Sequence, residues 1–252
     1  MEKHNSLIPA HDSKVRFIDI DTCAVLYHLW ENPPELFKDE NGRINIFVNS
    51  LSKQSIALVN TLVWYCQSED SFLHIKVKCE AEEWECFKKT YPEIADVSAV
   101  PDKNEIFYLV EKDNLPSSDF HKITVTQADY EKVLSEELPV NYEAEQIAEK
   151  IFHLWSGGKG NIRESASDYH TSMMSAIFWL ARKKDGKSLK ITEQNMRLEH
   201  RRWNAYMRSL GFVTGKVRDS SAKTHPCLVG YDDLSDADKM LDANPIKAVL
   251  GE

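Results

Sequence analysis

Apolar residues in the first 140 positions follow two different spacings along the chain. Some short runs are apolar throughout or at every second residue, as in strands, and the segments between them repeat every three or four residues, as in helices. The pattern predicts strands at 44–50, 72–80, 105–111 and 122–126, and helices at 54–67 and 81–94. This β-α-β-α-β order is typical of a Rossmann-like α/β fold with a mainly parallel sheet.

The pattern becomes helical beyond position 140. It predicts helices at 142–155, 167–184 and 192–210, and a fourth at 236–250 that Pro245 interrupts. The Gly-rich segment SGGKGN at 156–161 is a turn between the first two. We therefore predict two domains, an α/β domain at residues 1–140 and a mainly helical domain at residues 141–252, with Pro139 in the linker.

The first strand-to-helix turn of the Rossmann-like unit, VNSLSKQS at 48–55, contains no glycine. Glycines at this turn let the backbone of a dinucleotide-binding fold approach the pyrophosphate. The serines and Lys53 can still hold an anion, and Glu80 is the acidic residue that could meet a ribose. We expect a degenerate scaffold or dimerisation unit without a cofactor, and residual NAD(H) binding is the alternative.

Charge and composition narrow the class of protein. The chain has 252 residues and a formal net charge of -9, which argues against general binding to nucleic acid or to an anionic membrane surface. No signal peptide and no run of membrane-spanning length is present, so we expect a soluble cytoplasmic protein. The five cysteines are odd in number and lack a CxxC pair, which predicts reduced thiols.

The helix predicted at 192–210 carries the first candidate site residues. Thr192 can cap its N-terminus and Gly211 can close its C-terminus. One face contains Met196, His200, Trp203, Met207 and Leu210, and Glu199, Arg202 and Tyr206 lie beside it, at the border of any cavity that Trp203 faces. From Arg197 to Lys223, seven basic residues stand against two acidic ones. A basic segment beside an aromatic ring suits an adenine-plus-phosphate ligand, although a tryptophan at helical spacing can also be a core residue.

The same region resembles the ryanodine-receptor repeat (RyR) domain over roughly residues 192–250. The segments LEHRRWNAYMRSLGF and GKVRDSSAKTHPCLVGYDDLSDADKMLDANPIKAV match its helix with E-H-x-R-W, its R-D-D segment and its H-P-C-L-V segment, in that order. The G-W-x-Y-G turn of the family reads GFVTG at 211–215, and Ser220 replaces the second aspartate. Upstream, YEAEQIAEKIFHLW resembles the lead-in helices of bacterial RyR proteins, and residues 15–100 resemble their degenerate TrkA-N-type Rossmann module.

The resemblance implies a binding protein rather than an enzyme. In calcium-release channels, paired RyR repeats form a pocket that resembles an adenine-nucleotide site, with tryptophans stacked on the base. Bacterial members have been proposed as sensors of nucleotide signals in antiviral defence. We therefore expect a non-enzymatic protein that binds a nucleotide-like signal of adenine or ADP-ribose type, passes it to a separate effector protein and forms a homodimer. The alternative is a protein-protein interaction module without a small-molecule ligand.

Carried over position by position, the resemblance gives each candidate a role. Trp203 stacks on the base, the three cations Arg202, Arg218 and Lys223 meet phosphate, and His225 and Asp242 read polar groups. The full candidate set is Glu199, His200, Arg202, Trp203, Arg218, Lys223, His225, Pro226, Tyr231 and Asp242. The HPCLV segment can equally be structural, with Leu228 and Val229 anchored in the core and the loop holding His225 against the Trp203 helix.

The spacing of Cys, His and Glu residues along the sequence does not indicate a catalytic site or a metal site. Cys227 could act as a nucleophile with His225 as base, but no third orienting group is evident. The residues His153, His170, Glu199 and His200 contain no H-x-x-x-H pair. We predict no catalytic residues and no metal site.

Overall fold

The computed structural model describes residues 8–9, 15–16, 19–95, 107–115, 117–134, 139–184 and 189–252. The first half contains β1 (Ile8–Pro9), β2 (Val15–Arg16), α1 (Ile20–Glu31), the 3-10 turn η1 (Pro34–Phe37), β3 (Arg43–Val48), α2 (Lys53–Tyr65), β4 (Phe72–Val77), α3 (Ala81–Thr90), β5 (Tyr108–Lys112), β6 (His121–Lys122) and α4 (Gln127–Leu134). The second half contains α5 (Pro139–Ser156), η2 (Ile162–Glu164), α6 (Ala166–Lys184), α7 (Glu193–Ser209), β7 (Val213–Thr214), β8 (Thr224–His225), η3 (Tyr231–Asp233), α8 (Asp236–Leu241) and α9 (Asn244–Leu250).

A four-stranded sheet with the order β5-β4-β3-β6 forms the α/β part of the molecule. All three pairings are parallel, and Ile46 of β3 pairs with both Ile75 of β4 and His121 of β6. Five consecutive residues of β3, from Ile44 to Val48, are buried, as expected for a strand covered on both faces. The mixed α/β class with a parallel sheet is confirmed. The last strand is shorter than predicted. Of the predicted residues 122–126 only Lys122 pairs with β3, together with His121 just before that range.

The helices of the second half follow the predicted pattern with two corrections. Pro139 is the first residue of α5 rather than part of a linker, a position that suits proline because the N–H of a helix's first residue needs no partner. Pro245 is the second residue of α9. The predicted long helix is therefore two helices, which are separated at Asp242 and Ala243, before the proline. No helix in the described ranges is both long and apolar enough to cross a membrane.

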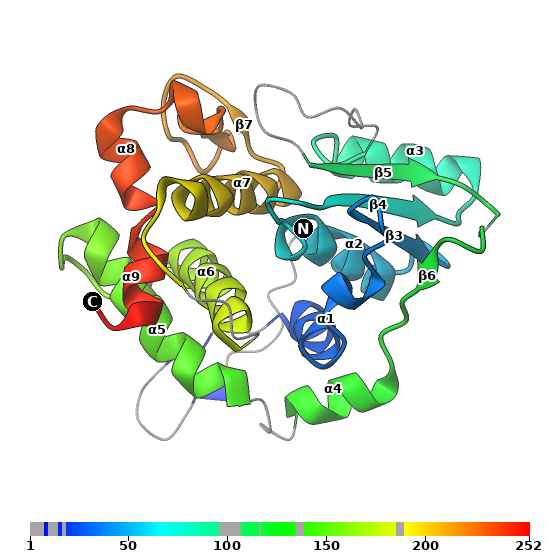
Figure 1. Ribbon diagram of the computed structural model, residues 1–252, viewed down its shortest axis with the longest axis horizontal. Helices are drawn as coiled ribbons and strands as arrows, with labels where there is room; N and C mark the ends of the chain where they lie inside the picture. The colour runs from blue at the N-terminus through cyan, green and yellow to red at the C-terminus, as the bar shows by residue number, and fades with distance from the viewer. Residues whose placement is uncertain are drawn as a thin grey trace.

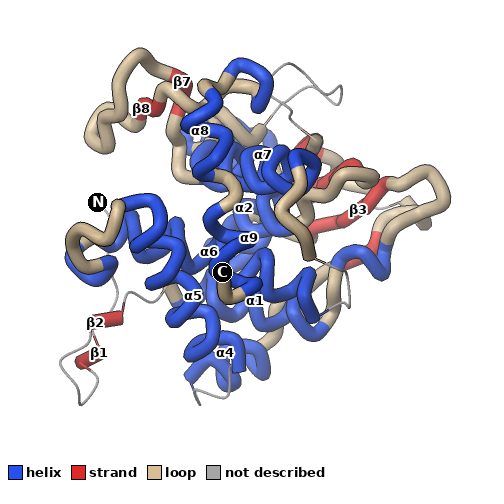
Figure 2. The backbone as a smooth tube through the Cα atoms, turned by 60° about the vertical axis from the view of Figure 1, so that its left-hand side comes forward, coloured by secondary structure: helices blue, strands red, loops and turns tan. Residues whose placement is uncertain are grey.

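Helix α7 lies between the sheet and the other C-terminal helices (Figure 1). It packs on α2, while α5, α6 and α9 pack on one another. The short strands β7 and β8 lie far from the four-stranded sheet, beside α8 (Figure 2). Buried apolar side chains from α1 to α9 form one continuous cluster. The predicted boundary at 140 lies within the first turn of α5, and the apolar cluster extends across it.

The glycine-free turn before α2 is closed by its own side chains. Ser52 caps α2 by accepting the N–H of Ser55 at 3.2 Å, and its hydroxyl lies 3.0 Å from that of Ser55. The Lys53 ammonium forms an ion pair with Asp21 of α1. The groups expected to hold an anion are thus bonded to protein partners.

Two arginines join the C-terminal helices to the sheet side. Arg182 of α6 donates to the carbonyl of Gln67, just beyond α2, and its guanidinium lies 3.5 Å from the centre of the Phe178 ring. Arg201 of α7 donates to the carbonyl of Ser68 at 2.7 Å. Carbonyls after a helix end need such donors, so these bonds fix α6 and α7 relative to α2.

Replacing Arg182 by Met should lower the free energy of unfolding by about 1–3 kcal/mol, because the buried carbonyl of Gln67 loses its donor. The control is Lys150→Met, since Lys150 is exposed on the neighbouring helix α5 and should change stability by less than about 0.5 kcal/mol. Urea denaturation followed by circular dichroism measures both. Equal effects of the two substitutions would contradict this role of Arg182.

Candidate functional site

A cavity of about 200 Å³ lies where the C-terminal helices converge. Each of α5, α6, α7 and α8 contributes to its wall, as do the loop between α7 and α8 and the start of α9. Its lining comprises Ile151, Trp155, Ser167, Asp168, Thr171, Ser172, Ser175, Glu199, His200, Trp203, Met207, Phe212, Arg218, Ser220, His225, Cys227, Leu234, Asp238, Leu241, Asp242, Asn244 and Pro245. The cavity therefore belongs wholly to the C-terminal part of the chain.

Six of the ten candidate site residues line this cavity, namely Glu199, His200, Trp203, Arg218, His225 and Asp242. The structure brings together side chains that come from separate segments of the sequence. The cavity does not include Arg202, Lys223, Pro226 or Tyr231.

Trp203 is half-buried and lies between two imidazoles. Its ring stacks on that of His200 with centroids 5.8 Å apart, and His225 meets it edge-on at 4.9 Å. The expectation that the HPCLV loop holds His225 against the Trp203 helix is confirmed. Leu228 is fully buried as predicted, whereas Val229 is only partly buried.

A second tryptophan, Trp155 of α5, lines the same cavity and was not among the candidates. The guanidinium of Arg218 lies 6.0 Å from its ring centre. Trp155 follows Phe152 on a regular helical pattern next to a Gly-rich turn, so its sequence context indicated only helix packing. Its contribution to the site arises from the tertiary packing of α5 against α6 and α9.

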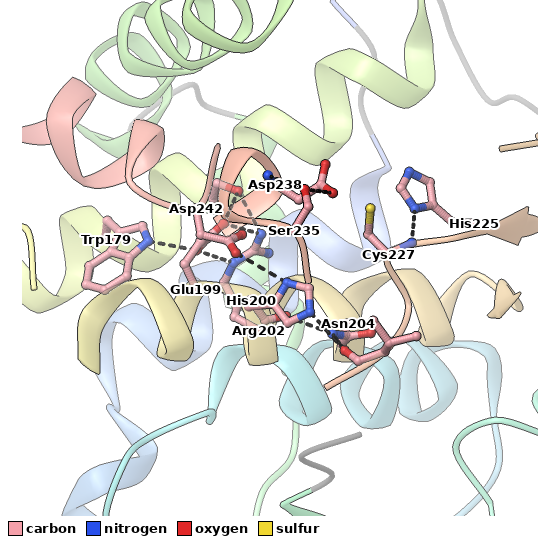
Figure 3. A network of polar contacts seen from close by, with 12 residues as sticks. Trp179, Glu199, His200, Arg202, Asn204, His225, Cys227, Ser235, Asp238 and Asp242 are labelled. Carbon is pink, nitrogen blue, oxygen red and sulfur yellow. Dashed lines mark hydrogen bonds and ion pairs between the residues drawn. The ribbon is translucent and has the colours of Figure 1, made fainter. Parts of the chain in front are cut away.

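Arg202 is fully buried and forms an internal ion pair. Its Nε and Nη2 atoms donate to the two carboxylate oxygens of Glu199 at 2.9 and 2.8 Å, and Nη2 also donates to Ser175 Oγ at 2.7 Å. Glu199 accepts a further bond from the indole N–H of Trp179 at 2.7 Å, and Figure 3 shows these side chains joined in one network. This placement corrects the predicted phosphate contact of Arg202, because its guanidinium is enclosed by α6 and α7.

The other three candidates also lie outside the cavity, in different surroundings. Lys223 is exposed and donates to the carbonyl of Leu210 at 2.7 Å, and Pro226 is exposed on the loop. Tyr231 is buried, with the Arg197 guanidinium 4.7 Å from its ring centre. The predicted ligand contacts of these three residues are therefore not supported by the shape of the cavity.

Several of the basic side chains between Arg197 and Lys223 form ion pairs within the protein. Arg197 pairs with Asp232 at 2.7 Å and Arg208 pairs with Glu93 at 2.7 Å. Arg218 is the arginine that lines the cavity, and its side chain is 56% exposed and 3.5 Å from Asp168. Of the predicted phosphate-binding cations, Arg218 is thus the one placed to meet a ligand.

Asp242 and His200 form a polar pair in the cavity wall. Nε2 of His200 lies 2.9 Å from the carbonyl of Val229, and because a carbonyl can only accept, Nε2 carries a proton. Nδ1 of His200 faces Asp242 Oδ2 at 3.3 Å, a contact drawn in Figure 3. A single further proton is therefore available to the pair, on either the imidazole or the carboxyl group.

Burial raises the pKa of Asp242 to about 6, although the neighbouring His200 partly offsets the shift. The ionised carboxylate is disfavoured in the low-dielectric wall. At neutral pH the ionised Asp242 therefore lowers the free energy of unfolding.

The His225–Cys227 pair is arranged for structure rather than for nucleophilic attack. The backbone N–H of Cys227 donates to His225 Nδ1 at 3.1 Å, so this nitrogen faces the loop backbone and not the thiol. Burial raises the pKa of the Cys227 thiol and lowers that of His225. The cysteine is then a thiol and the histidine is neutral near pH 7.

Metal ligands do not gather in the part of the chain that the structure describes. No group of three or more His, Cys, Asp or Glu side chains there is placed to hold an ion. All five cysteines are free thiols.

Replacing Arg202 by Met should destabilise the protein by about 3–5 kcal/mol, because the buried carboxylate of Glu199 would lose its counter-ion. The control Arg218→Met removes a half-exposed cation and should cost less than about 1 kcal/mol. Urea unfolding of both variants measures the difference. A stable Arg202→Met protein would contradict the internal role of this arginine.

The raised pKa of Asp242 predicts a pH-dependent stability. Between about pH 4 and pH 6 the folded state binds more protons than the unfolded chain, so the free energy of unfolding should fall as pH rises through this window. Asp242→Asn removes the titrating group. As pH rises from about 4 to 6, the free energy of unfolding of the variant should therefore increase relative to that of the wild type, and at pH 7 the variant should be more stable by about 1–3 kcal/mol. Urea titrations from pH 4 to pH 8 test this, and a difference that stays constant with pH would refute it.

Comparison of the chain with protein-family models, with curated proteins and with solved structures found no match. The resemblance to the RyR domain accordingly rests on the motif residues themselves.

Proposed function

We propose that the C-terminal helical region binds a nucleotide-like small molecule in the cavity lined by Trp155 and Trp203. The observation that carries this proposal is the convergence of two tryptophans from different helices and an exposed arginine on one cavity. Indole rings stack on flat heterocycles, and a guanidinium forms charge-assisted hydrogen bonds with phosphate. This is the combination that a base attached to a phosphate requires.

The size of the cavity sets the orientation of such a ligand. Pockets that enclose a drug-sized molecule measure roughly 300–1,000 Å³, whereas this one measures about 200 Å³. The space suits the heterocycle, and a sugar and phosphates would extend outward. Arg218 is well placed to meet them because its side chain is more than half exposed.

The proposed activity is binding and not catalysis. The groups that could attack a substrate are engaged elsewhere, since His225 Nδ1 accepts a backbone N–H and the Cys227 thiol is protonated. Glu199 accepts hydrogen bonds from Ser175, Trp179 and Arg202. These contacts leave the aromatic and charged surfaces of the cavity for ligand recognition, as in a sensor of a nucleotide signal that acts through another protein.

Trp203→Ala should abolish ligand binding, because the loss of the indole removes the stacking surface. The indole is partly exposed at the cavity but also packs against the apolar cluster, so we expect a moderate loss of stability, smaller than the about 3–5 kcal/mol of a fully buried tryptophan. The measurement is a thermal-shift screen against mono-, di- and cyclic nucleotides and ADP-ribose. A ligand at 100 times its dissociation constant should stabilise the wild type by about 2.7 kcal/mol.

Trp155→Ala should also weaken binding, and Leu154→Ala is its matched control, since Leu154 is 41% exposed on the same turn of α5. A large loss of stability in Trp203→Ala would identify this tryptophan as a core residue. The absence of a shift with every nucleotide would contradict the proposal and favour a partner protein.

A further inference from the structure

Carboxylates outnumber fixed cations in the cavity wall. The lining contains four acidic side chains, Asp168, Glu199, Asp238 and Asp242, and one arginine, Arg218. The cavity is therefore acidic, although the surrounding sequence from Arg197 to Lys223 is basic.

Two of the four acidic side chains are compensated by neighbouring cations. Glu199 is neutralised by the buried Arg202, and Asp168 lies 3.5 Å from Arg218. The charges that remain are those of Asp238 and Asp242, both contributed by the α8 segment.

Asp238 and Asp242 have no arginine or lysine partner in the described part of the chain. Asp238 accepts a hydrogen bond from the Ser235 hydroxyl at 2.6 Å. The Asp242 side chain is 13% exposed, and its Oδ2 lacks a well-aligned hydrogen bond, although His200 Nδ1 lies 3.3 Å away. A carboxylate held in this way in a cavity wall is suited to a donor or a positive charge brought by a ligand.

The two indole rings of the cavity also favour a positively charged ligand. The faces of Trp155 and Trp203 carry the negative side of the ring quadrupole, which attracts cations, and tryptophan does so best among the aromatic residues. His225 gives no compensating positive charge, because burial and the nearby Arg218 lower its pKa. A phosphate inside the cavity would meet Asp238 and Asp242, whereas a cationic ring would be attracted by both the carboxylates and the indoles.

We propose that the group inserted into this cavity is a positively charged heterocycle, such as a pyridinium or an N-alkylated purine, with Asp238 and Asp242 as its counter-charges. The inference rests on the proposed function and specifies the class of ligand. It also assigns a polarity to the bound molecule, with the cationic ring inside and the phosphate outside at Arg218.

The test compares ligands that have nearly the same shape and differ in ring charge. The first pair is nicotinamide mononucleotide and its reduced form, and the second is 1-methyladenosine monophosphate and adenosine monophosphate. Isothermal titration calorimetry at pH 7.5 measures the four dissociation constants. The cationic member of at least one pair should bind roughly tenfold more tightly than its neutral partner, or better.

The double variant Asp238→Asn/Asp242→Asn should reduce this preference to within about threefold of unity, because amides keep the shape of the carboxyl groups and remove their charge. Asp233→Asn is the matched control, since Asp233 is exposed on η3 and lies outside the cavity. It should retain the preference of the wild type.

The possible outcomes of these titrations contradict different parts of the proposal. Equal or tighter binding of the neutral members overturns the cation inference and leaves the proposed function standing. A preference that survives in the double variant overturns the role of the two carboxylates. Failure of all four compounds to bind, together with no shift in the nucleotide screen, contradicts the proposed function and this inference with it.

Discussion

The ion pair between Glu199 and Arg202 fixes the orientation of the helix on which the cavity depends. Both side chains belong to α7, and their hydrogen bonds to Ser175 and Trp179 tie that helix to α6. Residues three and four apart lie on neighbouring positions of a helix surface, so fixing Glu199 and Arg202 against α6 also sets the direction of Trp203. A buried ion pair often contributes little net stability compared with an apolar replacement. Its contribution here is to hold α7 in one rotational position about its axis.

The cations of α7 divide according to the partner that each one meets. Arg201 and Arg208 contact the sheet side through Ser68 and Glu93, and Arg197 contacts Asp232. The positive charge read from this stretch of sequence is therefore used in packing. The uncompensated charge of the cavity comes instead from the α8 segment, which supplies Asp238 and Asp242. Local charge along the sequence and the charge of the site differ for this reason.

The pattern of apolar residues predicted the long helices better than the short ones. Helices α5, α6 and α7 each extend over 17 to 19 residues, and Thr192 caps α7 by accepting the N–H of Asn195 as expected. Helix α1 was missed because it has only 12 residues and four consecutive ones, Ala24 to Tyr27, are apolar, which obscures the helical period.

The site was predictable only where a single helix or loop carries it. Trp203 and His200 share the predicted face of α7, and His225 lies in the predicted loop. By contrast, Trp155 reaches the cavity only because α5 packs against α6 and α9, and Asp238 only because α8 packs against α7. Neither segment contains a local signal for these contacts. The pairing of His200 with Asp242 likewise depends on where the break between α8 and α9 falls. Tertiary contacts of this kind are set by the shapes of packed surfaces and not by spacing along the chain.

The HPCLV loop acts on both histidines that flank Trp203. The carbonyl of Val229 accepts a hydrogen bond from the Nε2–H of His200, which leaves Nδ1 facing Asp242. The backbone N–H of Cys227 donates to Nδ1 of His225, so the proton of the neutral ring must lie on Nε2. One short loop therefore determines which nitrogen of each imidazole is a donor. The structural and the ligand-binding interpretations of this loop are compatible, because the hydrogen bonds that hold the loop in place also set the chemistry of the two rings beside the tryptophan.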